Sequence, residues 1–427
     1  MHTIFALATA RGKSGVAVIR ISGPDAHAVA ACLARDLPQV GRFALRQLRD
    51  ADGALLDEAL VLRFDAPNSF TGENTIEFQI HGSLAAIRAV EQAIAATGMA
   101  RMAEPGEFTR RALMNGNLDL AQVEGLSDLI AAETQAQLRQ AQDLFTGKMR
   151  DFADGCRDDL LRAAALIEAT IDFADEEVPV DVSPEVGMLI GRVLDNIDGQ
   201  LNGFSGAARL RHGFEVAIIG EPNVGKSTLL NRIAGRDIAI TSEIAGTTRD
   251  VLEVRVDLNG LPVTFLDTAG LRDSDDAVEK IGIARARDRA LAADIRVLLV
   301  DGLVDDTGFD PGVSIDLSYK TKADVTGQGI SGLSGQGVDK VLADVSALLA
   351  DRVIDLPVAS HERHRQALVA ARSSLADAKA AFDGGAAGAE IIALHLRDGA
   401  RSLDSLIGRM DVEAILGEIF AQFCIGK

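Results

Sequence analysis

The sequence contains no tryptophan, one tyrosine and three cysteines among its 427 residues. The cysteines Cys32, Cys156 and Cys424 lie far apart, without a C-x-x-C pair and without a neighbouring histidine pair. Disulfide frameworks and zinc sites both need clustered ligands, so this spacing argues against both. We therefore expect a reducing, cytoplasmic compartment.

Long uncharged apolar runs are also missing. None approaches the roughly 18 residues that a helix needs to cross a bilayer. Arg11, Lys13 and Arg20 interrupt the apolar pattern of the first 22 residues, whereas a secretory signal keeps its positive charge ahead of its apolar segment. We expect a soluble chain with no membrane partner.

Positive charge is scarce, because 43 Lys and Arg stand against 63 Asp and Glu and give a formal net charge of -20. Proteins hold nucleic-acid phosphates through clustered lysine and arginine. If RNA is a partner, it must therefore meet a local basic patch or a second protein. The length predicts about two to four domains, since single cores stop growing near roughly 250 to 300 residues.

The first stretch, residues 1–117, mixes short apolar runs with glycine and proline. The runs at 15–21, 59–64 and 75–80 are typical of strands, and 84–96 is typical of a helix. This mixture predicts a compact α+β domain.

Two helical stretches flank a second α/β stretch. Residues 118–210 and 356–427 carry apolar side chains at helical spacing, which predicts long amphipathic helices. Residues 211–355 alternate buried-strand runs with helices, which predicts a mostly parallel sheet. We favour one discontinuous helical domain with the α/β domain inserted into it, and two independent helical pieces are the alternative. The strands expected in the inserted domain are 214–219, 263–266, 295–300 and 313–317.

A glycine-rich motif predicts a phosphate site in the inserted domain. Residues 220–227, GEPNVGKS, fit G-x-x-x-x-G-K-[ST] between a predicted strand and a predicted helix. Glycine lets backbone N–H groups turn around a phosphate chain, and the helix N-terminus adds partial positive charge. Lys226 is expected to neutralise the β- and γ-phosphates, and Ser227 to bind Mg²⁺. The nucleotide contacts predicted here are Asn223, Val224, Gly225, Lys226, Ser227 and Thr228.

Two further motifs follow the phosphate loop in the order in which they occur along GTPase sequences. Residues 267–270, DTAG, close the predicted strand 263–266 and place a carboxylate beside the metal. Thr247 and Thr248 lie between the two motifs, where a mobile loop can bring a second hydroxyl to Mg²⁺. The nucleotide contacts predicted here are Thr247, Thr248, Asp267, Thr268, Ala269 and Gly270.

Base recognition departs from the guanine motif N-K-x-D. Thr321, Lys322 and Asp324 follow the last predicted strand, with threonine in place of asparagine. The Asp324 carboxylate still favours guanine, because adenine would leave it unpaired. We expect guanine to be bound with weakened affinity. The residues that resemble the loop accompanying this motif are Ser331, Gly332 and Leu333.

The residue that orients the attacking water is missing from its usual place. Leu271 follows the DTAG motif, whereas Ras-like enzymes have glutamine there. Another group must orient the water, and another positive charge must stabilise the transition state. Glu279 is a nearby acid that suits the first task, and the alternative is that it caps the following helix.

Together these motifs resemble the MnmE (TrmE) family of potassium-activated tRNA modification GTPases, and the resemblance covers essentially the whole chain. The segments that carry it are 103–112 (AEPGEFTRRA), 115–120 (NGNLDL), 220–227, 246–250 (GTTRD), 267–272 (DTAGLR) and 423–427 (FCIGK).

The resemblance implies a homodimer formed through the N-terminal domain, whose two G domains meet when GTP and K⁺ are bound. Ser227 and Thr248 would hold Mg²⁺. Glu279 would orient the water, so the implied catalytic residues are Glu279, Lys226 and Thr248. The implied K⁺ ligands, which take the place of an arginine finger, are Asn223, Ser242, Ile244 and Thr247; Ser242 would also contact GTP.

The resemblance also implies that the N-terminal domain binds 5-formyl- or 5,10-methylene-tetrahydrofolate. Arg20 and Glu77 fall at folate-binding positions, and an ordinary surface pair is the alternative. Lys427 is carried over as a further contact. Asn117 stands where the family usually has lysine, and a neutral amide cannot neutralise a carboxylate. Cys424 is either a thiol for chemistry or a packed residue at a helix end.

The implied function is the addition of an aminomethyl or carboxymethylaminomethyl group at carbon 5 of the wobble uridine of certain tRNAs, in a heterotetramer with the flavin-dependent partner MnmG (GidA). GTP hydrolysis would drive an open-to-closed cycle and would not itself transfer carbon. Two alternatives stay open: a G-protein switch in ribosome assembly, and a folate-dependent aminomethyltransferase that acts alone.

Overall fold

The structure is a computed structural model that describes most of the chain. Its internal contacts divide the chain into two compact units, Met1–Ser127 with Asp404–Lys427, and Asp128–Leu403. The boundaries expected at residues 117, 210 and 355 stay predictions, because this division groups helical and G-domain residues together. The described residues are 2–172, 183–236, 238–240, 253–267, 288, 292–303, 313–354, 356–384, 388–409 and 426.

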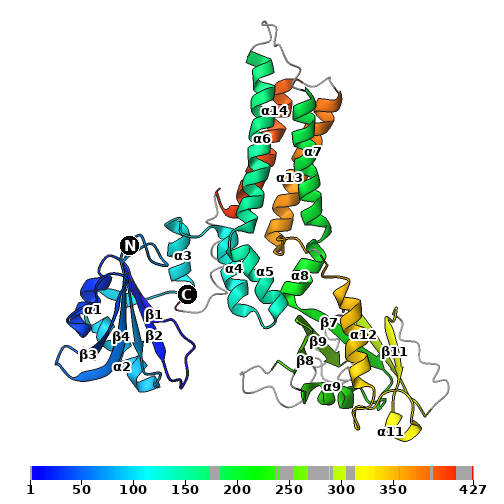
Figure 1. Cartoon of the computed structure of the whole chain (residues 1–427), viewed down its shortest axis with the longest axis horizontal. Helices are drawn as coiled ribbons and strands as arrows, with labels where there is room; N and C mark the ends of the chain where they lie inside the picture. Colours follow the sequence, from blue (N-terminus) through cyan, green and yellow to red (C-terminus); the bar gives the residue numbers. More distant parts are fainter. Residues whose placement is uncertain are drawn as a thin grey trace, which may run out of the picture. The chain divides into compact units, whose positions relative to one another are not determined.

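The N-terminal domain contains a six-stranded sheet with the order β3-β4-β5-β2-β1-β6 (Figure 1). Its pairs are antiparallel except for β1 and β6, which are parallel. The predicted α+β class is confirmed. The strands are β1 (Thr3–Leu7), β2 (Ala17–Ser22), β3 (Phe43–Arg49), β4 (Leu55–Phe64), β5 (Thr75–Ile80) and β6 (Ala100–Met102).

The two faces of this sheet differ. Helices α1 (Ala26–Ala34) and α2 (Leu84–Ala96) share one apolar core with the first face. On the second face, Phe108 of α3 (Glu107–Met114) packs with Ile4 and Ala6 of β1. Phe43 and Leu45 of edge strand β3 are 70% and 58% exposed, and the strand alternation places them on this second face.

Long helices precede and follow the inserted domain, and most of them belong to the second unit. Helix α7 packs against both α6 and α13, so a helix from before the inserted domain contacts one from after it. None of the described helices is long and apolar enough to span a membrane. The helices are α4 (Leu120–Ala131), α5 (Gln135–Phe145), α6 (Lys148–Asp172), α7 (Ser183–Asn202), α8 (Phe204–His212), α13 (Glu362–Gly384) and α14 (Ala389–Asp404), followed by the 3₁₀ turn η1 (Ser405–Ile407).

The inserted domain has a five-stranded sheet with the order β11-β10-β7-β9-β8. All pairs are parallel except β8 with β9, which confirms the predicted mostly parallel sheet. One apolar core joins the sheet to α9 and α12. The elements are β7 (Phe214–Gly220), α9 (Lys226–Ala234), β8 (Glu253–Leu258), β9 (Leu261–Asp267), β10 (Ile295–Val300), β11 (Leu317–Lys320), α11 (Ala323–Thr326) and α12 (Val338–Ala350).

The strand predicted at 313–317 is wrong, because β11 begins only at Leu317. Val313 and Ile315 pack as partly buried side chains against the cluster of Ala217 and Ile219. Pairing with β10 starts where Leu317 meets Val297. The apolar residues Val313 and Ile315 therefore belong to a segment that packs against the sheet but is not one of its strands. Residues 410–425 of the predicted helical stretch 356–427 lie outside the described residues.

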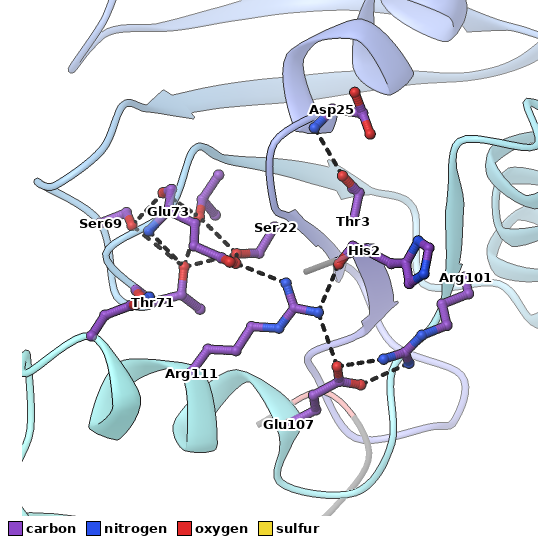
Figure 2. A network of polar contacts seen from close by, with 12 residues as sticks. His2, Thr3, Ser22, Asp25, Ser69, Thr71, Glu73, Arg101, Glu107 and Arg111 are labelled. Atoms are coloured by element: carbon purple, nitrogen blue, oxygen red, sulfur yellow. Dashed lines mark hydrogen bonds and ion pairs between the residues drawn. The ribbon is translucent and has the colours of Figure 1, made fainter.

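A buried polar network ties α3 to the N-terminal sheet and to the loop at 69–73 (Figure 2). The Arg111 guanidinium donates to the carboxylates of Glu73 at 2.9 Å and Glu107 at 2.9 Å, and to the His2 carbonyl at 2.7 Å. Glu107 also accepts two hydrogen bonds from Arg101, at 2.8 and 2.6 Å. Buried charges are stable only when they are paired and hydrogen-bonded, so this network fixes α3 in place.

Glu107 makes the network sensitive to acid. Burial raises the pKa of Glu107, but Arg101, the Glu104 N–H and Arg111 outweigh burial and lower the pKa from 4.5 to about 2. The resulting stabilisation is complete above pH 4.5 and is lost as the pH falls toward 2.

We predict that Glu107→Gln lowers the free energy of unfolding of the N-terminal domain by about 3 kcal/mol at pH 7, because it leaves two arginines incompletely paired. The deficit should shrink below pH 4.5. Hydrogen exchange of β1 and α3 amides measures this, and Glu104→Gln is the control because the Glu104 side chain forms an exposed pair with Arg110, while the Glu104 N–H that contacts Glu107 is unchanged. Equal effects of the two substitutions at pH 7 would contradict the prediction.

Candidate functional site

The phosphate loop begins where β7 ends. Gly220 and Gly225 have φ angles of +154° and +106°, and Gly225 caps the N-terminus of α9. A Cβ on Gly220 would lie 2.5 Å from the Leu299 carbonyl oxygen. Only glycine therefore allows this close turn between strand and helix. The N–H groups at the start of α9 give the loop its affinity for anions.

The Lys226 ammonium is buried and held by this loop. Its Nζ donates to the carbonyls of Gly220 at 2.7 Å and Glu221 at 2.8 Å. Burial lowers the pKa of Lys226, and the nearby Asp267 carboxylate opposes that shift. The lysine predicted to neutralise phosphate charge is thus pre-oriented at the loop.

Ser227 and Asp267 meet beside the loop. The Ser227 hydroxyl donates to the Asp267 carboxylate at 2.6 Å. Ser227 lies in the first turn of α9, and Asp267 ends β9, which is parallel to β7. A hydroxyl and a carboxylate are hard oxygen donors of the kind that Mg²⁺ prefers, so this pair fits the implied metal.

A cavity of about 240 Å³ lies between the phosphate loop and the predicted guanine motif. Asp324 accepts a hydrogen bond from the Ser331 hydroxyl at 2.6 Å. The Thr321 hydroxyl donates to the Val300 carbonyl at 3.2 Å. The structure therefore brings the phosphate and base motifs to one cavity. It is lined by Asn223, Val224, Gly225, Thr228, Leu229, Leu299, Thr321, Lys322, Asp324, Ile330, Ser331, Gly332 and Leu333.

Several predicted site residues lie outside the described part of the chain, so their placement stays a prediction. They are Ser242, Ile244, Thr247, Thr248, Thr268, Ala269, Gly270, Glu279, Cys424 and Lys427.

The predicted folate residues Arg20 and Glu77 face each other across β2 and β5. The Arg20 Nε donates to a Glu77 carboxylate oxygen at 2.8 Å, and both side chains are mostly buried. The Arg20 guanidinium also lies 5.3 Å from the Phe70 ring centroid and 5.6 Å from that of Phe108. These contacts hold the guanidinium by cation–π attraction. Phe108 lies within the motif at 103–112, but the sequence predicted no role for either phenylalanine.

Asn117 braces the loop at 69–73. Its amide donates to the carbonyls of Ser69 at 2.9 Å and Phe70 at 3.3 Å, and the Asn115 amide donates to Thr71 at 2.6 Å. Both donors of the Asn117 amide are thus engaged within the protein. Asn117 therefore reaches the predicted folate site through the loop that carries Phe70.

Gly426 lies against the N-terminal domain. It has a φ of +104°, and a Cβ at this position would lie 2.0 Å from the Leu7 carbonyl oxygen. On the sheet, Leu7 neighbours Ala6, which pairs with Arg20. Only glycine allows this approach of the chain to the end of β1.

We predict that Asn117→Ala loosens the loop at 69–73 by about 1 to 2 kcal/mol, because two backbone carbonyls lose their donor. Hydrogen exchange of the loop amides should accelerate accordingly. Asn68→Ala is the matched control, since the Asn68 side chain makes no hydrogen bond to the residues that the structure describes. Unchanged exchange in Asn117→Ala would show that the brace contributes nothing.

Comparison with known proteins agrees with these sites. Residues 3–117 match the model of the GTP-binding protein TrmE N-terminus, and residues 120–424 match that of the MnmE helical domain. The chain is 56% identical to the tRNA modification GTPase MnmE of a Jannaschia species, 54% to that of a Ruegeria species and 52% to that of Roseobacter denitrificans, each over 100% of both chains.

A solved GTP-binding protein of Sulfolobus solfataricus in complex with GDP is 12% identical with a TM-score of 0.25, over 46% of this chain and 67% of that one. This score is too low to support a conclusion. The full-length relatives and the two matching domain models show the family directly, and they confirm the resemblance and the predicted fold class. The chain belongs to the MnmE (TrmE) family of tRNA modification GTPases.

Proposed function

We propose that this protein hydrolyses GTP and, with the flavin-dependent partner MnmG, adds an aminomethyl or carboxymethylaminomethyl group at carbon 5 of the wobble uridine of certain tRNAs. One observation carries the proposal: the chain combines the nucleotide cavity with a separate Arg20–Glu77 site, and it is related over its whole length to proteins named tRNA modification GTPases. A GTPase domain alone would account for neither the N-terminal site nor the full-length similarity.

The proposed hydrolysis follows from the phosphate loop. The Lys226 ammonium and the N–H groups of α9 stabilise the charge on the β- and γ-phosphates, while Ser227 and Thr248 hold Mg²⁺ near Asp267. Glu279 orients the attacking water, because the position that holds glutamine in Ras-like enzymes is Leu271 in this chain. The guanine base lies between Lys322 and the loop at 331–333, with Asp324 as its acceptor.

Potassium supplies the missing positive charge in this proposal. Asn223 is exposed on the phosphate loop with a φ of +63°, a left-handed conformation that asparagine tolerates. Its side-chain oxygen suits a K⁺ ion beside the phosphates, with Ser242, Ile244 and Thr247 as further ligands. A fixed cation at this place performs the task of an arginine finger.

The Arg20 site is proposed to bind 5-formyl- or 5,10-methylene-tetrahydrofolate. Its donor set fits this ligand, because Glu77 suits the amide edge of the pterin and Arg20 the anionic part. One of the five N–H donors of Arg20 is engaged with Glu77. The position of Gly426 next to Leu7 of β1 supports a role for Lys427 and Cys424, which are close to Gly426 in the sequence.

A homodimer is proposed through the second face of the N-terminal sheet. The strand register aligns exposed Phe43 with Leu62, and Leu62 with Glu77, which pairs with Arg20. An apolar surface that continues into a functional site is a common feature of protein interfaces. The acidic chain is proposed to work in the cytoplasm in a heterotetramer with MnmG, which would carry much of the tRNA-binding surface.

Two other candidate functions explain fewer of the observations. A ribosome-assembly switch leaves the Arg20–Glu77 site and the full-length similarity without explanation, and binding of tetrahydrofolate would argue against it. A folate-dependent aminomethyltransferase that acts alone leaves the nucleotide cavity without explanation, and modification without GTP would favour it.

We predict that GTP turnover is at least about tenfold faster in KCl than in NaCl at equal ionic strength, because a correctly placed cation stabilises the transition state. The Asn223→Ala variant should lose this difference while it still binds GDP. Phosphate release from purified protein measures the rate. Equal slow turnover in both salts would mean that the transition-state charge comes from another group.

A further inference from the structure

The guanine motif has an unusual support at the end of β10. Thr321 donates from its backbone N–H at 2.8 Å and from its hydroxyl at 3.2 Å, both to the Val300 carbonyl. A threonine hydroxyl carries one proton, whereas the asparagine of the usual motif has two N–H donors and an acceptor. The Thr321 side chain is therefore committed to β10, and its proton is not available to brace the rest of the motif.

Lys322 lies in a conformation that needs support. Its φ of +60° and ψ of 35° are left-handed, and it caps the short helix α11. Residues other than glycine, asparagine and aspartate rarely adopt this conformation, because the Cβ crowds the following carbonyl. The carbonyl of Lys322 accepts hydrogen bonds from the N–H groups of Val325 and Thr326, both at 3.0 Å. The backbone conformation of Lys322 thus sets the direction in which α11 starts, and with it the position of Asp324 in the first turn.

Asp301 supplies the support. Its carboxylate accepts a hydrogen bond from the Lys322 Nζ at 2.6 Å and another from the Leu303 N–H at 3.0 Å. Asp301 directly follows Val300, so two consecutive residues at the end of β10 hold Thr321 and Lys322. Lys322 and the Leu303 N–H keep the pKa of Asp301 below its usual value, so the carboxylate is ionised at neutral pH.

We propose that Asp301 is a positioning residue for guanine recognition: it holds Lys322 in its left-handed conformation and thereby aims Asp324 into the nucleotide cavity. This inference rests on the proposed binding of GTP. Ser331 already holds one oxygen of Asp324 at 2.6 Å. The Asp301–Lys322 pair fixes the backbone before Asp324, and Ser331, which follows it in the chain, holds its carboxylate. The position of the carboxylate is therefore set by both contacts.

The alternative is an ordinary exposed ion pair without functional effect, and such pairs usually contribute little. Asp316 provides the matched control. It pairs with Arg296 at 3.3 Å, at the opposite end of the same strand, away from the residues that line the cavity. The variants Asp301→Asn and Asp316→Asn each remove one carboxylate charge and keep the side-chain shape.

The experiment measures binding of GDP, GTP and ITP to the full-length chain, together with kcat and KM for GTP. Asp301→Asn should weaken GTP binding and raise KM about tenfold, as expected when a group that orients a ligand contact is released. Its kcat at saturating GTP should stay within about twofold of the unchanged protein, because the phosphate loop is intact. The preference for GTP over ITP, which lacks the 2-amino group that Asp324 binds, should also fall.

A double-mutant cycle with Lys322→Met, which keeps the aliphatic stem, tests whether the two residues act as a unit. If they do, adding Lys322→Met to Asp301→Asn should cost much less than the same change in the unchanged protein. Additive effects, or equal GTP binding by the Asp301→Asn and Asp316→Asn variants, would overturn the inference while leaving the proposed GTPase intact. Failure of the unchanged protein to bind any guanine nucleotide would overturn the proposed function itself.

Discussion

A buried cation that must find acceptors on the main chain shapes the phosphate site. Removal of an ammonium group from water is unfavourable unless its protons are hydrogen-bonded. Lys226 meets this requirement with the carbonyls of Gly220 and Glu221 at the end of β7. Arg111 in the N-terminal domain does the same with Glu73, Glu107 and the His2 carbonyl. In both domains the cation fixes a loop. The phosphate loop presents residues proposed to bind GTP, and the loop at 69–73 carries Phe70, which packs against Arg20.

The two sites differ in how their charges are arranged. In the nucleotide site, cationic and N–H groups converge on the place of the phosphates, and oxygen donors meet at the proposed metal position. In the N-terminal site, Arg20 is already neutralised by Glu77 and stabilised by two aromatic rings. A nucleotide carries several negative charges close together, whereas folate presents a flat ring with a polar amide edge and a separate anionic tail. The arrangement of charge in each site therefore agrees with the ligand proposed for it.

The sequence predicted the local fold of the phosphate loop, because that fold follows from a strand, a glycine-rich turn and a helix, and β7 and α9 flank the turn in this order. It did not predict β8, in which Glu253, Arg255 and Asp257 alternate with apolar residues. The position of β11 was wrong because packing of Val313 and Ile315 produced the same apolar spacing as a strand. Periodicity reports burial of side chains and does not report which backbone groups form hydrogen bonds.

Contacts between distant segments were beyond the reach of sequence reasoning. Nothing in the local pattern indicates that Asn117 binds the carbonyls of Ser69 and Phe70, or that Asp301 holds Lys322. Each contact joins residues that only the sheet topology brings together. The family resemblance supplied candidate ligand-binding residues, and the three-dimensional structure supplied neighbouring residues that contact them.

The most direct test of the central claim is a reconstituted reaction, because it asks whether both sites serve one chemical outcome. Mass spectrometry would follow carbon 5 of the wobble uridine in tRNA incubated with this protein, flavin-loaded MnmG, NADH, methylene-tetrahydrofolate, ammonium or glycine as the nitrogen donor, Mg²⁺, potassium and GTP. We predict modification by the unchanged protein, and loss of it in either Lys226→Met or Arg20→Ala. Modification at the unchanged rate by either variant would contradict the claim that the two sites act in a single reaction.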